Sequence, residues 1–81
     1  MIPKIIEAKY KRDYIIRVRF LDGTEGDIDL RDELYGLIFE PLQDLDVFKQ
    51  GFVHPDFHTI CWPNGADLAP EFVYDHIRRA A

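Results

Sequence analysis

The sequence contains a single cysteine, Cys61, among 81 residues, and it has no long apolar segment. One cysteine excludes an intramolecular disulfide. Apolar fragments such as YII and LIF fall far short of the about 20 residues that a membrane-spanning helix needs. The first residues, MIPKIIEAKY, lack the apolar core of a secretion signal. We therefore expect a cytoplasmic protein with no membrane association.

Two phosphate- and cation-binding patterns are also missing. The glycine spacing and the lysine of a P-loop do not occur. A calcium loop that started at Asp22 would place Gly26 at a ligand position and Asp27 where a sharp turn requires glycine. The acidic run is therefore better explained as a solvated surface than as a metal site.

The histidines and the cysteine provide only weak candidate sites. His54 and His58 flank a PDF turn, and with Asp56 they are the candidate metal ligands, short of the complete ligand set that a structural zinc requires. In an extended strand Cys61 points away from His58. Because its neighbours are isoleucine and tryptophan, we expect Cys61 to be a buried core residue and not a nucleophile. We expect no catalytic residue, no cofactor and no resident metal.

The residues that are abundant indicate a small folded domain with an uneven charge distribution. Hydrophobic residues make up 47% of the chain, which suffices for a core, and we expect one domain over residues 1–81 with little room for a deep cavity. The net charge is −5; residues 1–20 hold six basic and two acidic residues, whereas residues 21–46 hold nine acidic residues and only Arg31. The candidate partner-binding surface, called the acidic strip below, consists of Glu25, Asp27, Asp29, Asp32 and Glu33.

Two N-terminal segments alternate with the period of half-buried strands. KIIEAKY places Ile6 and Ala8 on its apolar side, and YIIRVRFL sets apolar residues opposite two arginines. A KRD loop between them pairs Ala8 with Ile16 and Glu7 with Arg17. The sequence thus predicts an antiparallel pair with one apolar face and one charged face.

A third strand, TEGDIDL, follows the dipeptide DG, which is typical of a two-residue hairpin turn. That turn would place a carboxylate opposite Phe20 on the apolar face. A DGT loop avoids the conflict by pairing Val18 with Ile28 and Arg19 with Asp27. We therefore expect a meander of three antiparallel strands whose outer face carries arginine and carboxylate side chains.

Beyond residue 30 the spacing becomes helical. Residues 31–37 form a loose turn, and a central helix begins near Pro41, is capped by Asp44 or Asp46, and ends before Gly51. Its buried stripe is expected to contain Leu42, Leu45 and Phe48.

The last third predicts a short hairpin and a C-terminal helix. Two strand-like runs flank the PDF turn, and Pro70 suits a first helical position. Glu71 in the first turn and Arg78 in the last match the helix dipole. The expected buried residues of this helix are Phe72, Val73 and Ile77. The fold class is α+β: a small antiparallel sheet, made of the N-terminal meander and the later hairpin, packed with a central and a C-terminal helix.

The stretch CWPNGADLAPE predicts a structural corner between strand and helix. Asn64 and Gly65 fit a turn with positive φ, Pro63 ends strand pairing, and Asp67 is placed to accept backbone N–H groups. Trp62 would hold the corner against the core. The corner motif therefore comprises Trp62, Pro63, Asn64, Gly65, Asp67, Pro70 and Glu71.

Three stretches, DYIIRVRFLDGTEGDIDL, IFEPLQDLDVFKQ and TICWPNGADLAPEFVY, resemble the bacterial domain of unknown function 2442 (DUF2442) family over nearly the whole chain. The specific mark is the motif W-P-N-G-A-D-L-x-P-E, from Trp62 to Glu71. The resemblance implies an α+β fold without established catalytic residues. Genes of the family often lie beside another small uncharacterised family, in pairs that resemble toxin and antitoxin. The resemblance therefore implies a small non-enzymatic module that binds a small protein encoded by an adjacent gene, as an antitoxin does.

Two other functions and one assembly remain open from the sequence. In a small metal-binding regulatory protein, the ligands would be His54, Asp56 and His58. A nucleic-acid-binding regulator would use Lys4, Lys9, Lys11, Arg12 and Arg17, but the chain is acidic and shows no helix-turn-helix pattern, so we do not expect it to bind nucleic acid on its own. Some DUF2442 members carry an added helix-turn-helix domain, for which this sequence has no room. An edge-to-edge homodimer is the alternative assembly.

Overall fold

The computed structural model describes residues 2–80 and contains a three-stranded sheet, a two-stranded sheet and a C-terminal helix. The strands of the first sheet lie in the order β1-β2-β3, both neighbouring pairs are antiparallel, and β4 pairs with β5. The predicted α+β class is confirmed. The elements are β1 Ile5–Arg12, β2 Ile15–Phe20, β3 Glu25–Asp29, η1 Arg31–Glu33, η2 Glu40–Gln43, α1 Leu45–Phe48, β4 Phe52–Val53, β5 Ile60–Cys61 and α2 Pro70–Ala80.

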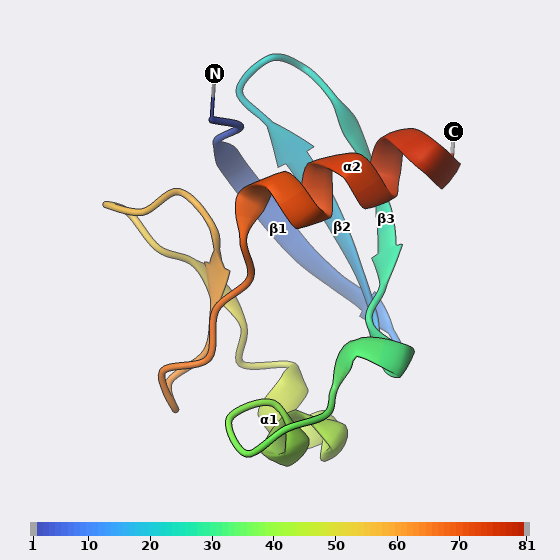
Figure 1. Ribbon diagram of the computed structural model, residues 1–81, viewed down its shortest axis with the longest axis vertical. Coiled ribbons are helices and arrows are strands. Elements are labelled where there is room, and N and C mark those ends of the chain that lie inside the picture. The colour runs from blue at the N-terminus through green and yellow to red at the C-terminus, as the bar shows by residue number, and fades with distance from the viewer. Residues whose placement is uncertain (1, 81) are drawn as a thin grey trace.

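Helix α2 crosses one face of the three-stranded sheet, and Figure 1 shows it in front of β1, β2 and β3. Val73 and Ile77 of α2 are buried against apolar side chains from that face. The β4–β5 hairpin lies beside β1, where the Ile5 N–H donates to the His58 carbonyl at 2.9 Å. The opposite face of the sheet, called the outer face below, is left to solvent. The buried core includes Ile5, Ile16, Val18, Phe20, Ile28, Leu30, Leu42, Phe48, Ile60, Trp62, Val73 and Ile77.

The pairing of β1 with β2 differs from the predicted register by two residues. Ala8 lies opposite Val18, and Glu7 lies opposite Arg19. Irregular pairing occurs at both ends of β1, and the one between residues 5 and 7 turns Ile5 into the core and leaves Ile6 exposed. The alternation predicted the faces of Ala8 and its neighbours correctly, but a bulge adds one residue and reverses the face at Ile6.

The pairing of β2 with β3 is also shifted by two residues. Ile16 lies opposite Ile28, and Val18 lies opposite Gly26. The connecting loop is Leu21 to Gly23, because the Phe20 N–H donates to the Thr24 carbonyl at 2.8 Å. The odd-length loop was correctly predicted, but its position was not. A shift of two residues keeps every side chain on its face, so polarity alone does not distinguish the two registers.

Gly26 gives the physical reason for the observed register. A Cβ atom at Gly26 would lie 2.6 Å from Ile77 Cγ2, which is closer than real contacts allow. The absent side chain therefore creates the space in which Ile77 of α2 packs onto β3. In the predicted register Ile28 would stand opposite Val18, and the helix would meet a filled position.

The central helix is shorter than predicted. It is divided into η2, with Pro41 in its first turn, and α1, whose N-cap Asp44 accepts a hydrogen bond from the Asp46 N–H at 2.9 Å. Leu42 and Phe48 are buried as predicted, but Leu45 is 37% exposed. The break at Asp44, where the backbone is extended, rotates Leu45 away from the core.

Helix α2 begins at Pro70, with Glu71 in the first turn and two arginines in the last, as predicted. Phe72, however, is 37% exposed, so its prediction as a buried residue is wrong. Tyr74 takes that place: its ring packs edge-on against Phe20 with centroids 5.0 Å apart. Tyr74 thus packs against β2, whereas Phe72 is turned outward.

Candidate functional site

The strand-to-helix corner is a compact hydrogen-bonded hairpin. The Trp62 N–H donates to the Ala66 carbonyl at 2.9 Å, and the Gly65 N–H donates to the Trp62 carbonyl at 3.0 Å. Gly65 has φ +92°, a conformation that side chains rarely adopt. The Trp62 indole N–H donates to the Phe48 carbonyl at 2.9 Å, which fixes the buried ring to α1. These bonds make the corner a structural element.

In the corner motif, Asn64 makes a long-range contact that was not predicted, and Asp67 lacks the hydrogen bond that was. Asn64 accepts from the Ala66 N–H and donates through Nδ2 to the Ile38 carbonyl, each at 3.0 Å. Asn64 thus ties the corner to the loop between η1 and η2. Asp67 is exposed; its backbone pairs with Cys61, and no hydrogen bond within residues 2–80 ends on its carboxylate. Its predicted capping bond is therefore not formed.

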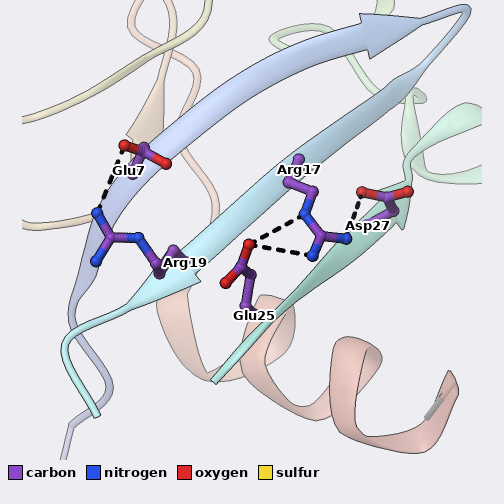
Figure 2. A network of polar contacts seen from close by, with 5 residues as sticks. All are labelled: Glu7, Arg17, Arg19, Glu25 and Asp27. Carbon is purple, nitrogen blue, oxygen red and sulfur yellow. Dashed lines mark hydrogen bonds and ion pairs between the residues drawn. The ribbon is translucent and has the colours of Figure 1, made fainter. Parts of the chain in front are cut away.

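The outer face of the sheet carries an ion-pair network (Figure 2). Arg17 donates to Glu25 at 3.1 Å and to Asp27 at 3.3 Å, and Arg19 lies 3.5 Å from Glu7. The hydrogen bonds that Arg17 donates, to Glu25 first and then to Asp27, raise its pKa. The predicted pair of Arg19 with Asp27 is wrong, because β3 is displaced by two residues and Arg17 takes that position opposite Asp27.

The remaining residues of the acidic strip lie where β3 leads into η1. The Asp29 carboxylate accepts from the Arg31 N–H at 3.0 Å and so begins the turn. Asp32 and Glu33 belong to η1, and both Asp29 and Asp32 are exposed. The acidic strip is thus divided: Glu25 and Asp27 are matched by an arginine, whereas the carboxylates at the η1 end have no arginine ion pair among the described residues.

The outer edge of β3 has backbone groups available for pairing. At the two ends of the β2–β3 ladder, hydrogen bonds join Phe20 with Thr24 and Tyr14 with Leu30. Because hydrogen-bonded pairs alternate in an antiparallel ladder, Gly26 and Ile28 bond to β2. The N–H and C=O groups of the three intervening residues point to the open side, where no strand of residues 2–80 pairs with them. These residues are Glu25, Asp27 and Asp29.

The His54 ring, one of the three candidate metal ligands, holds the turn that follows it. His54 Nδ1 accepts from the Asp56 and Phe57 N–H groups at 3.0 and 3.2 Å, and its ring stacks on Phe57 with centroids 4.4 Å apart. His58 has φ +52° at the end of this turn. Among residues 2–80, no group of three or more His, Cys, Asp or Glu side chains could hold a metal ion. The described side chains therefore give the metal-binding alternative no structural support.

Cys61 is a free, buried thiol, as its neighbours predicted. Burial, followed by the nearby charge of Asp67, raises the pKa of this thiol. A raised pKa leaves less thiolate at neutral pH, and thiolate is the nucleophilic form. This environment is the opposite of an activated catalytic cysteine.

Lys9 and Arg17, two of the N-terminal basic residues, share their face of the sheet with carboxylates. Lys9 lies opposite Arg17 on the outer face, where Glu7 and two further carboxylates are interspersed with them. An uninterrupted basic patch is the usual mark of nucleic-acid binding. The mixed charge of this face does not provide one. None of the helices within residues 2–80 is long and apolar enough to cross a membrane.

Sequence reasoning missed a small groove between the η1–η2 loop and the start of α2. It has a volume of about 310 Å³ and is lined by Glu33, Tyr35, Phe39, Asp67, Leu68, Ala69 and Phe72. The nearby Leu37 is 96% exposed. The sequence signal that could have indicated this groove is the run YGLIF, in which apolar residues surround a glycine in a loop.

The fold and these surfaces define a small α+β domain with an open strand edge and a hydrogen-bonded tryptophan corner. The chain belongs to the family described as protein of unknown function (DUF2442), whose model matches residues 5–79. This match confirms the resemblance carried by the corner motif. No curated protein and no solved structure matches the chain.

Proposed function

We propose that the protein is a non-enzymatic binding module that pairs the open edge of β3 with a strand of a small partner protein. The observation that carries the proposal is the row of unpaired backbone groups at Glu25, Asp27 and Asp29. Addition of a strand to such an edge is a common mode of protein recognition, since backbone hydrogen bonds supply affinity and side chains supply specificity.

The side chains of β3 favour a basic partner. The three residues with open backbone groups all carry a carboxylate, and the adjoining η1 adds two more carboxylates, those of Asp32 and Glu33. A strand with lysine or arginine at alternate positions would place positive charges beside them. Self-pairing is disfavoured: an antiparallel β3–β3 pair centred on Asp27 would oppose carboxylates from the two copies. The charges thus support a second protein over the edge-to-edge homodimer.

The family membership adds a suggestion about the partner's identity. DUF2442 genes resemble one half of toxin and antitoxin pairs, so the partner we propose is a small basic protein encoded by an adjacent gene. In that arrangement this chain acts as the antitoxin-like member and covers a strand of its partner. The role requires no catalytic group, cofactor or metal on this chain.

The first test is recovery of the partner from the native host. The tagged protein is captured at moderate salt, co-purified proteins are identified by mass spectrometry, and the mass of the complex is measured by light scattering. We expect a stoichiometric small basic protein. Recovery of the tagged chain alone, across several growth conditions, would refute the proposal.

A pair of variants then tests the edge itself. Asp27→Pro removes an N–H that points away from β2, so the β2–β3 ladder stays intact while strand addition is blocked. Asp27→Ala removes the same carboxylate and keeps the N–H. We expect at least about a tenfold loss of partner affinity for Asp27→Pro relative to Asp27→Ala. Equal affinity of the two variants, with both folded by circular dichroism, would exclude pairing at this edge.

Association kinetics test the contribution of charge. Asp29 and Asp32 are exposed and form no arginine ion pair among the described residues, so their replacement by asparagine leaves the outer-face network intact. We expect slower association and a weaker salt dependence for this double variant. An unchanged association rate would remove the acidic strip from the binding model.

A further inference from the structure

The groove between the η1–η2 loop and α2 combines aromatic side chains with carboxylates. Tyr35, Phe39 and Phe72 supply three aromatic rings, and Glu33 and Asp67 supply two negative charges. No lysine, arginine or histidine is among the groove's lining residues. A site with aromatic walls and only negative charges is complementary to a cation that has an apolar stem.

The walls of the groove are held together by hydrogen bonds from other elements. Asn64 of the corner donates to the Ile38 carbonyl at 3.0 Å, and Gln43 Nε2 donates to the Leu34 carbonyl at 2.7 Å. Both bonds fix the loop that carries Tyr35 and Phe39. The groove is therefore formed in the free protein, which lowers the ordering cost of binding.

Residues 2–80 do not supply a cation to this groove. Arg31, the arginine nearest to Glu33 in the sequence, lies over the Tyr14 ring at 5.6 Å from its centroid. Arg78 similarly lies over Tyr74 at 5.6 Å. Both arginines stack on aromatic rings, but neither ring belongs to the groove.

Apolar side chains next to the groove are exposed to an unusual extent. Tyr35 is 70% exposed, and Leu37 and Ile38 of the same loop are also exposed. Clustered apolar side chains at a surface mark sites of protein association. The occupant of the groove is thus better explained as a side chain on a polypeptide than as a free small cation, because a polypeptide would also cover this loop.

We propose that the groove binds an arginine side chain of the partner protein, as a second contact beside the strand added at β3. Arginine fits both features of the groove: its planar guanidinium stacks on aromatic rings and bonds carboxylates in a fork, whereas the lysine ammonium is a more strongly hydrated point charge. The inference rests on the proposed function, since the arginine belongs to the protein that pairs with β3.

The groove is first tested without the partner. The ¹⁵N-labelled protein is titrated with N-acetyl-arginine-N-methylamide at constant ionic strength, and N-acetyl-citrulline-N-methylamide serves as the uncharged isostere. We expect amide shifts confined to residues 33–39 and 66–72, with a dissociation constant on the order of tens of mM and about tenfold weaker binding of the citrulline compound. No saturable shift, or equal shifts with both compounds, would overturn the proposal.

Matched variants assign the contacts. Glu33→Gln and Phe72→Ala should each lower the affinity for the arginine compound by about threefold to tenfold. Glu40→Gln and Phe57→Ala change an exposed glutamate and an exposed phenylalanine outside the groove, and they should bind as the wild type does. Equal effects of groove and control variants would also overturn the proposal.

The recovered complex separates this inference from the proposed function. If Phe72→Ala weakens the partner complex and Phe57→Ala does not, the arginine contact holds. If Asp27→Pro abolishes the complex while Phe72→Ala and Glu33→Gln leave it unchanged, strand pairing stands and the groove assignment is wrong. If no partner is recovered, the proposed function fails, and the arginine titration decides the chemistry of the groove by itself.

Discussion

Replacement of Gly26 by valine should destabilise the protein through a single close contact. A Cβ atom at this position would lie 2.6 Å from Ile77 Cγ2, whereas ordinary contacts begin at 3.4 Å, so the helix or the strand must move to relieve the overlap. Overpacking of a core costs about 1–3 kcal/mol, and a valine with two more methyl groups belongs at the upper end. Removal of a strand glycine returns about 0.5–1 kcal/mol.

The net expectation is a loss of about 2 kcal/mol in the free energy of unfolding. For a domain of this size that corresponds to a lower Tm by roughly 8–16 °C. Urea denaturation followed by circular dichroism measures the change, with a lower midpoint at an unchanged slope. Wild-type stability for Gly26→Val would show that Ile77 does not lie against this strand as described.

A double-mutant cycle tests whether Ile77 is the cause. Ile77→Ala alone should cost about 2–5 kcal/mol because it leaves a cavity. In combination with Gly26→Val the alanine makes room, so the double variant should be more stable than additivity predicts by about 1–2 kcal/mol. Gly23→Val is the control: Gly23 has φ +92° with no neighbour within 4 Å, so its cost should add to that of Ile77→Ala. Additivity at Gly26 would refute the packing explanation.

Three further predictions concern the corner and the β2–β3 turn. Trp62→Phe removes the indole donor to the Phe48 carbonyl and should lower the free energy of unfolding by about 1–3 kcal/mol in urea; an unchanged midpoint would contradict this. Gly65→Val should cost about 1–3 kcal/mol because φ is +92°, while Gly65→Asn should cost less; equal melting of both variants would show that backbone conformation is not the cause. The hydrogen bond from the Tyr74 hydroxyl is the main cause that lowers the pKa of Asp22 below its ordinary value of 3.8. A lowered folded-state pKa adds stability above the unfolded-state pKa that is lost as pH falls through the folded-state value. The Tm of wild type should therefore exceed that of Asp22→Asn at pH 7, and the gap should shrink below pH 3.8; a gap independent of pH would refute the coupling.

The faces of the strands were predictable from the sequence, whereas their register was not. Alternation placed Val18 in the core and Arg17 outside, and the structure agrees. Registers that differ by two residues preserve this alternation, so the choice between them depended on Gly26 and on the helix that packs over it. The bulge that buries Ile5 likewise leaves no signal in hydrophobic periodicity.

The Asn-Gly turn of the corner was predictable because its causes are local. A proline, an Asn-Gly turn and a helix start within a few residues constrain the backbone through φ and short-range hydrogen bonds. Its long-range contacts were not predictable: the Trp62 indole bonds to Phe48 and Asn64 bonds to Ile38, partners that lie 14 and 26 residues away in the sequence. The groove was missed for the same reason, because it forms where two distant segments meet.

Local chemistry thus determined the α+β class, the strand faces, the helix start at Pro70 and the DUF2442 motif from Trp62 to Glu71. These features depend on dihedral preference and on the period of apolar residues, both of which are written in consecutive residues. The register, the open β3 edge and the groove were decided only by the tertiary structure. They depend on which surfaces meet, and contact between surfaces is set by the shapes of side chains that lie far apart in the chain.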